Sequence, residues 1–383
     1  MSHAPSAALR RRHDAVRAAC ERAGVDGLIV TARSNILYLT NFTGSAAIAV
    51  VTPDRLHFIT DFRYVTAVDA MQRAPEACPD LQLTVVQNTY DSTLAALLTS
   101  LGVSRMGFEA AHTTVSRHNW LTATLAQQAG APALVPLENV VEQLRMRKDE
   151  YELSMLRESA RLLSDVAIQV FGEVRRGRTE REVAQAIDRR LLAAGFERPS
   201  FDTIVASGPN AALPHAHPGE RMLGENELVV LDFGGVYRSY CSDLTRTVVL
   251  GTASDRVREV YAAVLEAHDH AIRTVGPGRS RFAIDAAARD VLVSHGLGDA
   301  FGHGTGHGLG IDIHEDPKVT RRIGEPSSAD AERLDVVDAG MVFTIEPGAY
   351  LPGWGGVRIE DDVLVTAHGV EVLTNVTTDL LEL

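Results

Sequence analysis

The sequence predicts two domains, an α/β domain at the N-terminus and an α+β domain behind it. The chain has 383 residues, which is enough for two hydrophobic cores. Short strand-like and helical segments alternate as far as residue 136, a pattern typical of an α/β domain. Over residues 137–383 helices precede runs of strands, which is typical of an α+β domain. The boundary is expected near Pro132 to Pro136.

The first domain is expected to begin with an amphipathic helix over residues 8–23, ended by Gly24. Helices are also expected over residues 91–101 and 115–130. The strand-like runs between them are rich in β-branched and aromatic residues and span residues 25–31, 35–40, 46–52, 56–60, 81–87 and 105–110. The polar residues of this domain form no cluster with metal-ligand spacing, so we expect the chemistry to lie in the second domain.

The second domain is expected to open with a long helix over residues 148–175, because its leucines recur along one face. Thr179 and Glu182 have the spacing of a capping box at the start of the next helix. A strand-rich stretch follows over residues 201–250, and further helices are expected near 253–275 and 281–295. Helices precede strands in both halves, an order that suggests an internal duplication.

Composition and charge narrow the function classes. A formal net charge of −13 argues against nucleic acid or an anionic membrane as the main partner. Cys20, Cys78 and Cys241 are odd in number and widely spaced, which suits a reducing compartment. No apolar stretch is long enough to span a bilayer, and the N-terminus lacks the apolar segment of a secretory signal. We therefore expect a cytoplasmic protein.

Carboxylates interrupt several strand-like runs of the second domain. Asp232 lies in LVVLDFGG, Glu346 in MVFTIEPG and Glu360 in GGVRIEDDVLV. A buried, ionised carboxylate without a partner is strongly unfavourable. With Asp243 there are four such groups, which two divalent cations would balance. Oxygen ligands with one imidazole suit manganese, cobalt, zinc or iron.

Asp232 and Asp243 lie in two apolar runs joined by GVYR, which predicts a hairpin. Folding the hairpin brings the two aspartates close on neighbouring strands, where their mutual repulsion requires a cation. The alternative is a surface hairpin with solvated aspartates. The apolar flanks of both strands argue against that alternative.

The segment FGHGTGHGLGIDIHE places His303, His307 and His314 among glycines. Glycine lets the backbone approach a crowded centre, and neutral imidazole is both a metal ligand and a general acid or base near neutral pH. One histidine is expected to bind metal while the others face the substrate. A phosphate-binding loop is the alternative, but no Lys-Ser or Lys-Thr pair follows the glycines. His215 lies in a separate loop bounded by prolines.

Glu346 is expected at the end of a strand, because a Pro-Gly pair follows it. Arg358 and Glu360 are two residues apart, so we expect them to project from one face of a single strand. Arg358 would then support a carboxylate ligand, with a simple buried Arg–Glu pair as the alternative. Asp361 and Asp362 compete with Glu360 for the ligand role, and the alternation with Arg358 favours Glu360.

These motifs together resemble a known family. The second domain resembles the M24-type metallopeptidases, which include methionine aminopeptidase, prolidase and aminopeptidase P and share the pita-bread fold. The resemblance runs through VASGPNAALPHAHP, VVLDFGGVYRSYCSDLTRTVVLG, GHGTGHGLGIDIHE, FTIEPGAY and GVRIEDDVLVT. The first domain resembles the creatinase-type N-terminal domain in NILYLTNFTGSAA and ITDFRY. The resemblance thus implies a creatinase-like domain over residues 1–136 and a pita-bread catalytic domain over residues 137–383.

The resemblance also implies a site with two divalent metal ions, of which manganese is favoured. Asp232 would bind one ion, His307 and Glu346 would bind the second, and Asp243 and Glu360 would bridge both. All five residues occur here in the order that the family shows.

The implied reaction is peptide hydrolysis by a hydroxide that bridges the two ions. Glu346 would move a proton from the attacking water to the leaving amine. His215, His303 and His314 match the histidines that face the substrate in the family. Of these, His303 and His314 would stabilise the tetrahedral intermediate.

The large N-terminal domain separates the chain from methionine aminopeptidases and implies an Xaa-Pro peptidase. We expect it to cut before a proline in second position, and we favour the aminopeptidase P type because a short chain suggests an open cleft. The alternatives are an Xaa-Pro dipeptidase (prolidase), a creatinase without metal ligands, and an inactive binding module. A dipeptidase needs a cation that closes its cleft, for which the candidates are Arg238, Arg321, Arg322 and Arg358. The family also implies a homodimer.

Overall fold

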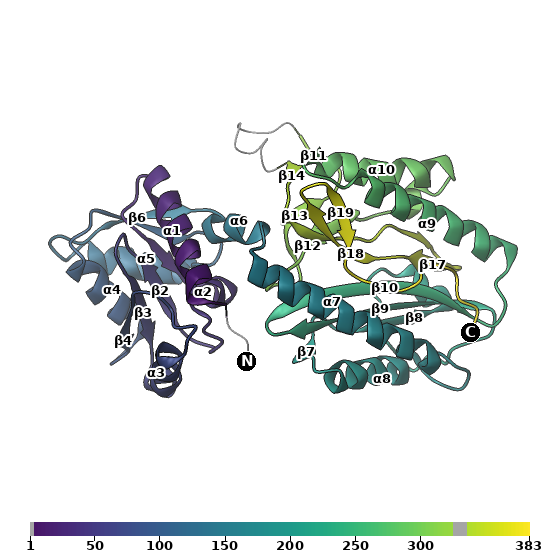
Figure 1. Cartoon of the computed structure of the whole chain (residues 1–383), viewed down its shortest axis with the longest axis horizontal. Coiled ribbons are helices and arrows are strands. Elements are labelled where there is room, and N and C mark those ends of the chain that lie inside the picture. The colour runs from purple at the N-terminus through teal and green to yellow at the C-terminus, as the bar shows by residue number, and fades with distance from the viewer. Residues whose placement is uncertain (1–3, 325–334) are drawn as a thin grey trace. The chain divides into compact units, whose positions relative to one another are not determined.

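The computed structural model describes residues 4–324 and 335–383. The chain divides into two compact units, Met1–Arg145 and Met146–Leu383 (Figure 1). Each unit has its own hydrophobic clusters.

The division falls later in the chain than the boundary expected after residue 136, because the last elements of the first unit extend beyond it. Strand β6 (Ala133–Leu137) joins the edge of the first sheet. Helix α6 (Val140–Met146) follows, and its Arg145 Nη1 donates a hydrogen bond to Asn35 Oδ1. Asn35 in turn donates to the carboxylate of Glu142, so α6 is bonded to the body of the first unit.

The first unit is an α/β structure with one mixed six-stranded sheet. Its remaining elements are α1 (Ser6–Arg22), β1 (Leu28–Val30), α2 (Arg33–Thr40), β2 (Ile48–Val51), β3 (Leu56–Thr60), η1 (Phe62–Tyr64), α3 (Val65–Arg73), β4 (Leu81–Val85), α4 (Tyr90–Ser100), β5 (Arg105–Glu109) and α5 (Val115–Leu125). The strand order is β4-β3-β2-β1-β5-β6. Ile29, Val50 and Ile59 of the sheet pack with Leu94 and Leu98 of α4 in one buried cluster.

The strand predicted over residues 35–40 is wrong, because these residues belong to helix α2. A six-residue run is too short to distinguish the two-residue period of a strand from the 3.6-residue period of a helix. Tertiary contacts decide the outcome. The buried carboxylate of Glu109 accepts hydrogen bonds from the backbone N–H groups of Thr31 and Ala32, just before the helix begins.

The second unit is an α+β structure whose strands lie between two pairs of helices. Its helices are α7 (Glu150–Val170), η2 (Phe171–Glu173), α8 (Glu180–Ala193), η3 (Gly208–Ala212), α9 (Asp255–Thr274), α10 (Arg281–Ser294) and η4 (Gly298–Ala300). In Figure 1, α7 and α8 lie on one side of the strands and α9 and α10 on the other. The predicted capping box is present: Thr179 Oγ1 accepts from Glu182 N–H, and the Glu182 carboxylate accepts from Thr179 N–H.

The strands of the second unit form two main sheets. One has the order β10-β9-β7, with β8 also paired to β9, and the other has the order β13-β12-β15-β18-β19. The small pairs are β11–β14 and β16–β17. The bounds are β7 (Arg198–Pro199), β8 (Ile204–Ser207), β9 (Glu227–Tyr237), β10 (Tyr240–Leu250), β11 (Arg279–Ser280), β12 (Gly306–Gly308), β13 (Glu315–Val319), β14 (Val336–Val337), β15 (Val342–Ile345), β16 (Gly348–Leu351), β17 (Gly355–Arg358), β18 (Asp361–Thr366) and β19 (Gly369–Val372).

A buried arginine joins the two halves of the second unit. Arg246 of β10 donates to the backbone carbonyl oxygens of Thr245 and Glu360 and to the carboxylate of Asp361. Thr245 and Glu360 also form an isolated bridge between antiparallel segments. These bonds hold β10 against the start of β18, although more than a hundred residues separate the two in the sequence.

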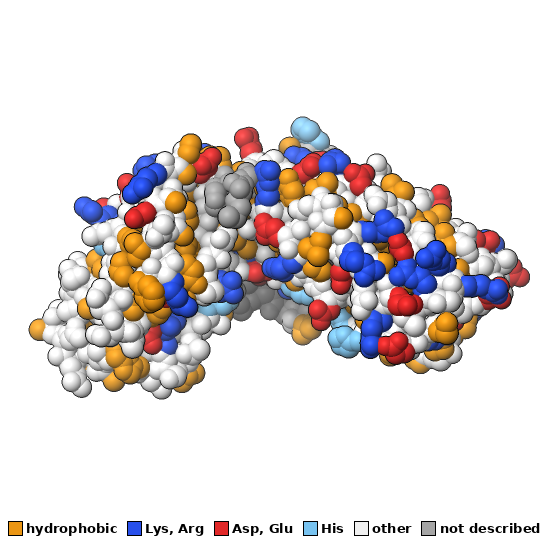
Figure 2. Space-filling model, turned by 90° about the horizontal axis from the view of Figure 1, so that it is seen from below, with side chains coloured by type: hydrophobic (Ala, Val, Ile, Leu, Met, Phe, Trp, Pro, Cys, Tyr) orange, Lys and Arg blue, Asp and Glu red, His pale blue; other side chains and the backbone are white. Residues whose placement is uncertain are grey.

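The surface of the second unit carries both signs of charge. Figure 2 shows Lys and Arg side chains interspersed with Asp and Glu over the face that it presents. Within the two described ranges of the chain, no helix has the length and apolar composition needed to cross a bilayer.

Candidate metal centre

The β9–β10 hairpin brings Asp232 and Asp243 together, as predicted. Its turn residues, Arg238 and Ser239, both have positive φ, as a tight hairpin turn with the strand twist requires. Asp232 lies opposite Thr245, and Asp243 lies opposite Gly234. The two aspartates are therefore diagonal neighbours on one face of the pair.

The glycine-rich segment places His307 in the middle of the second sheet. Strand β12 pairs with β13 on one side and β15 on the other. A Cβ atom at Gly306 would lie 1.8 Å from the carbonyl oxygen of Thr344, and one at Gly308 would lie 2.2 Å from that of Asp316. Both positions therefore require glycine for this close packing.

His307 presents one ring nitrogen to the carboxylates. Its Nδ1 lies 3.1 Å from the carbonyl oxygen of Gly308, which can only accept, so Nδ1 carries the proton. Nε2 lies 3.8 Å from Asp243 Oδ2 and 3.6 Å from Glu346 Oε1. Burial lowers the pKa of His307 to about 3, so the ring is neutral and its Nε2 is free to accept a bond or bind a metal.

Glu346 and Glu360 both lie at strand ends. Glu346 follows β15, as predicted, whereas Glu360 lies between β17 and β18. The single strand predicted through Arg358 and Glu360 is therefore wrong, because the chain leaves one two-stranded pair and enters the main sheet at that point. Thr245 Oγ1 donates to Glu360 Oε2 at 2.6 Å and fixes the carboxylate there.

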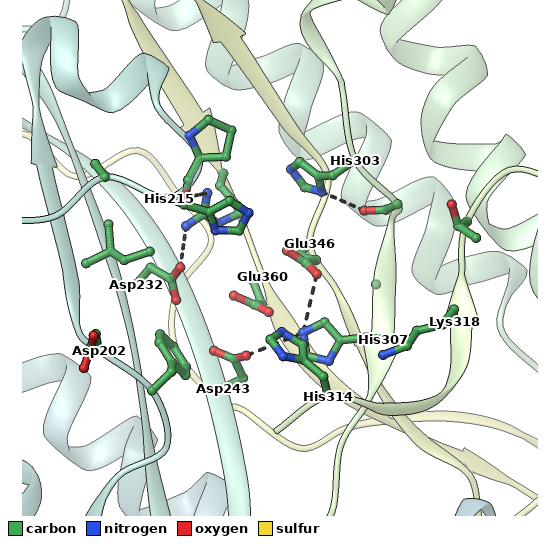
Figure 3. A pocket seen from close by; sticks show the side chains of 18 of the residues that line it. Asp202, His215, Asp232, Asp243, His303, His307, His314, Lys318, Glu346 and Glu360 are labelled. Atoms are coloured by element: carbon green, nitrogen blue, oxygen red, sulfur yellow. Dashed lines mark hydrogen bonds and ion pairs between the residues drawn. The ribbon is translucent and has the colours of Figure 1, made fainter. Parts of the chain in front are cut away.

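The structure gathers the five predicted ligands around one cavity of 530 Å³ (Figure 3). One ligand atom each from Asp243, His307 and Glu360 lie within 4.8 Å of one another. Asp232 and Glu346 line the same cavity. Asp232 Oδ1 and Asp243 Oδ1 are buried and find no hydrogen-bond partner among the residues that the structure describes, which is unusual for native carboxylates. Orphaned anionic oxygens beside a neutral imidazole fit divalent cations.

The carboxylates strongly perturb one another. Burial, then repulsion from Asp232 and other carboxylates, raises the pKa of Asp243 well above its ordinary value. Burial and the charges of Asp243, Glu346 and Asp232 do the same for Glu360. Burial raises the pKa of Glu346 to about 7. Protons therefore occupy part of this cluster near neutral pH when no cation does.

Arg358 bonds directly to Asp232 and only indirectly to Glu360. Its Nη2 donates to Asp232 Oδ2, whereas it reaches Glu360 only through the hydroxyl of Thr245, to which Nε donates at 3.1 Å. Nη1 donates to the Tyr350 hydroxyl at 2.8 Å. Thr245 and Tyr350 could not be predicted from the sequence, because a hydroxyl in a strand has no distinctive spacing.

The three histidines expected to face the substrate all line the cavity. Tyr350 Oη lies 2.9 Å from His303 Nε2, and His303 Nδ1 lies 2.8 Å from the carbonyl oxygen of Gly304. Both ring nitrogens of His303 are therefore engaged. The rings of His307 and His314 meet edge to face, with centroids 4.3 Å apart.

Glu180 anchors the loop that carries His215. Its buried carboxylate accepts hydrogen bonds from the backbone and hydroxyl of Ser207, the amide of Asn210 and the backbone N–H of Gly219. These donors span the segment that includes His215. The capping pattern at Thr179 predicted the helix start, but gave no sign that the next residue would bind this loop.

Asp361 and Asp362 lie outside the lining of the cavity. Asp361 pairs with Arg246 and accepts from the hydroxyl of Thr374. Asp362 Oδ2 accepts from the backbone N–H of Asp243. Neither competes with Glu360 for a position in the cavity.

Lys318 is a cavity cation that the sequence analysis missed. Of the four candidate arginines only Arg358 lines the cavity, and it is bonded to Asp232 and Tyr350. Lys318 lies on β13 directly opposite His307 in the strand pairing. The alternation of the strand could have placed Lys318 beside the histidines if β13 had been predicted.

The protein without bound metal is expected to lose stability as the pH rises above about 7. Glu346, Asp243 and Glu360 have raised pKa values in the folded state, so they keep protons that the unfolded chain has already released. Stability falls as the pH rises wherever the folded state binds more protons. The buried histidines have lowered pKa values and oppose this trend near pH 6.5, where the unfolded chain still holds about half of its histidine protons, and this opposition fades above about pH 7.

Unfolding by urea from about pH 7 to about 8.5, with and without a chelator, would measure this trend. Saturating Mn²⁺ should remove most of it, since cations replace the protons. Glu346→Gln should make the metal-free trend shallower. A metal-free protein whose stability rises over this range would contradict the account.

Comparisons with known proteins agree with this architecture. Residues 154–367 match Metallopeptidase family M24, and residues 12–147 match the Creatinase/Prolidase N-terminal domain. An Xaa-Pro dipeptidase from Pyrococcus furiosus is 38% identical over 245 residues, 64% of this chain and 68% of its own length.

Two solved structures are similar over nearly the whole chain. An Xaa-Pro dipeptidase from Bacillus anthracis has a TM-score of 0.89 and 34% identity, covering 98% of this chain and 100% of its own. An X-Pro aminopeptidase from Thermotoga maritima has a TM-score of 0.83 and 30% identity, covering 95% of this chain and 100% of its own. The predicted creatinase-like and pita-bread folds are confirmed. The chain therefore belongs to metallopeptidase family M24.

Proposed function

We propose that this metallopeptidase is an Xaa-Pro dipeptidase that uses two divalent ions, with manganese favoured. The observation that carries the proposal is the set of four carboxylates and one imidazole around a single cavity. Two of the carboxylates have buried oxygens without partners. The carboxylate-rich donor set favours manganese, because carboxylate oxygen suits Mn²⁺ while imidazole also suits zinc and iron.

The choice of a dipeptidase reverses the preference for aminopeptidase P that the sequence analysis favoured. Among the similar proteins whose activity is named, Xaa-Pro dipeptidases and prolidases outnumber aminopeptidases. Aminopeptidases also occur among them. The similar proteins support the dipeptidase alternative better. An inactive binding module is disfavoured, because all five ligand positions are filled.

In this proposal the five side chains divide the ions as the family resemblance implies. Asp232 would hold one ion, His307 and Glu346 would hold the other, and Asp243 and Glu360 would serve both. When bound, the ions supply Lewis acidity to the scissile carbonyl and make water a nucleophile near neutral pH.

The chain itself supplies proton transfer and alignment. The Glu346 side chain is 18% exposed, and its exposed part faces the cavity. There the carboxylate can take a proton from water and pass it to the proline nitrogen. His314 and His215 have exposed rings that can donate to the substrate carbonyl. His303 has both nitrogens engaged, so we assign it to positioning Tyr350 rather than to direct donation. A homodimer and a cytoplasmic location stay predictions.

Substrate length tests the proposal directly. The protein loaded with Mn²⁺ should hydrolyse Ala-Pro with a kcat/KM at least about tenfold higher than Ala-Pro-Ala, because a dipeptidase requires the free proline carboxylate. Release of alanine, followed by amino-acid analysis, measures both reactions. A faster reaction with the tripeptide would favour aminopeptidase P, and no reaction with either would contradict an Xaa-Pro peptidase.

Removal of a bridging ligand tests the metal assignment. Asp243→Ala should lower the bound metal and reduce kcat by at least about 10³-fold, because catalytic groups that act as a unit are not replaceable singly. Asp299→Ala, at an exposed position outside the cavity, is the matched control and should retain both. The first unit should stay folded in each variant. Full activity in Asp243→Ala would refute the site.

A further inference from the structure

A buried ion pair on α10 bonds to the segment that carries His303. Asp285 is 1% exposed, and its carboxylate accepts hydrogen bonds from Arg289, one turn later, at 2.9 and 3.0 Å. The same guanidinium also donates to the backbone. Its Nη1 donates to the carbonyl oxygen of Phe301 at 3.0 Å, and its Nη2 donates to that of His303 at 2.8 Å. Neither member of the pair lines the cavity.

The carboxylate of Asp285 holds the other end of the same segment. Its Oδ1 accepts from the backbone N–H of Thr305 at 3.1 Å and from the Thr305 hydroxyl at 2.9 Å. The carbonyl oxygen of Thr305 accepts in turn from the backbone N–H of Glu346 at 2.7 Å. The ion pair is therefore bonded to His303 itself and to the chain on both sides of it.

Residues 301–305 depend on such an anchor, because they form neither helix nor strand. His303 lies between two glycines, which give the backbone wide conformational freedom. Ring contacts add to the hydrogen bonds. The Arg289 guanidinium carbon lies 4.2 Å from the ring centroid of Phe301, and that ring meets the His303 imidazole edge to face at 5.0 Å. Helix α10 thus places the imidazole through its backbone and through a neighbouring ring.

The imidazole has one orientation that connects it to the metal centre (Figure 3). Its Nδ1 lies 2.8 Å from the carbonyl oxygen of Gly304, which can only accept, so Nδ1 carries the proton. Its Nε2 then accepts the hydroxyl proton of Tyr350. Burial lowers the pKa of His303 to about 4, so the ring keeps this neutral form at neutral pH. Tyr350 accepts from Arg358, which is bonded to Asp232.

We propose that Asp285 and Arg289 are positioning residues for the hydrolysis, which hold His303 in contact with Tyr350 from outside the cavity. The inference rests on the proposed function and adds to it the groups that fix this contact. A guanidinium suits the task, because its planar fork bonds a carboxylate and two carbonyl oxygens at once. An ammonium is a point charge and cannot reproduce that pattern.

The test changes the fork and keeps the charge, in the Mn²⁺-loaded enzyme with Ala-Pro as substrate. Arg289→Lys should lower kcat about 10- to 100-fold, because a displacement of about 1 Å is enough to misalign a reacting site. KM should stay within about threefold, since the pair lies outside the cavity. The bound Mn²⁺ should be unchanged. Arg273→Lys, at an exposed position on α9, is the matched control and should keep the wild-type kcat.

A double-mutant cycle separates positioning from a merely structural role. His303→Ala alone should also lower kcat. In that background Arg289→Lys should cause no more than about a threefold further loss, because the group that it positions is gone. The inference is overturned if the two losses multiply, if His303→Ala keeps the wild-type kcat, or if Arg289→Lys loses metal. A lower melting temperature without a fall in kcat would overturn it as well.

Asp285→Asn replaces Arg289→Lys in the same cycle if the latter does not fold. It keeps the shape of the side chain and removes the charge that orients the guanidinium. Asp290→Asn, exposed on the same helix, is its matched control.

The wild-type protein offers a measurement that needs no variant. The amide of Thr305 should exchange with solvent far more slowly than an unbonded amide, because it donates to the buried Asp285. Unprotected exchange would contradict the inference. Failure of the proposed function is distinguishable, since the wild-type enzyme would then not hydrolyse Ala-Pro, whereas the exchange of Thr305 would stay slow.

Discussion

Mutual repulsion among buried carboxylates is the constraint on which the second unit depends. Asp232, Asp243, Glu346 and Glu360 converge on one cavity, and the chain offers them a single committed arginine, Arg358. Raised pKa values follow from this crowding, so protons stabilise the cluster only where the pH is low enough. Divalent cations would stabilise the same arrangement at neutral pH.

The fold supplies this arrangement by joining two halves of one unit. The hairpin β9–β10 carries two carboxylates from one half, while β12 and the ends of β15 and β17 carry the histidine and the other two. Thr245 and Arg246 bond to the side chain and backbone of Glu360 and fix the halves together. In each half the helices precede the strands, and the two pairs of helices enclose the strands that carry the centre from both sides.

The sequence predicted the ligands well, because each is a charge in an otherwise apolar run. Contacts between residues far apart in the sequence were harder to predict. Residues 35–40 form a helix, and the carboxylate of Glu109, far away in the sequence, accepts hydrogen bonds from the backbone just before it. Glu180 and Tyr350 act through partners that no local pattern reveals. Lys318 was missed because its position in the cavity depends on the pairing of β13 with β12.

Metal titration of the chelated protein would show whether divalent ions replace protons in the carboxylate cluster. Isothermal calorimetry at pH 7 in two buffers of different ionisation enthalpy would give both the stoichiometry of Mn²⁺ and the number of protons released. We expect two ions per chain and the release of at least one proton, because Glu346 with a pKa of about 7 and its neighbours hold protons that the ions displace. Saturable binding without proton release, or no saturable binding, would contradict it.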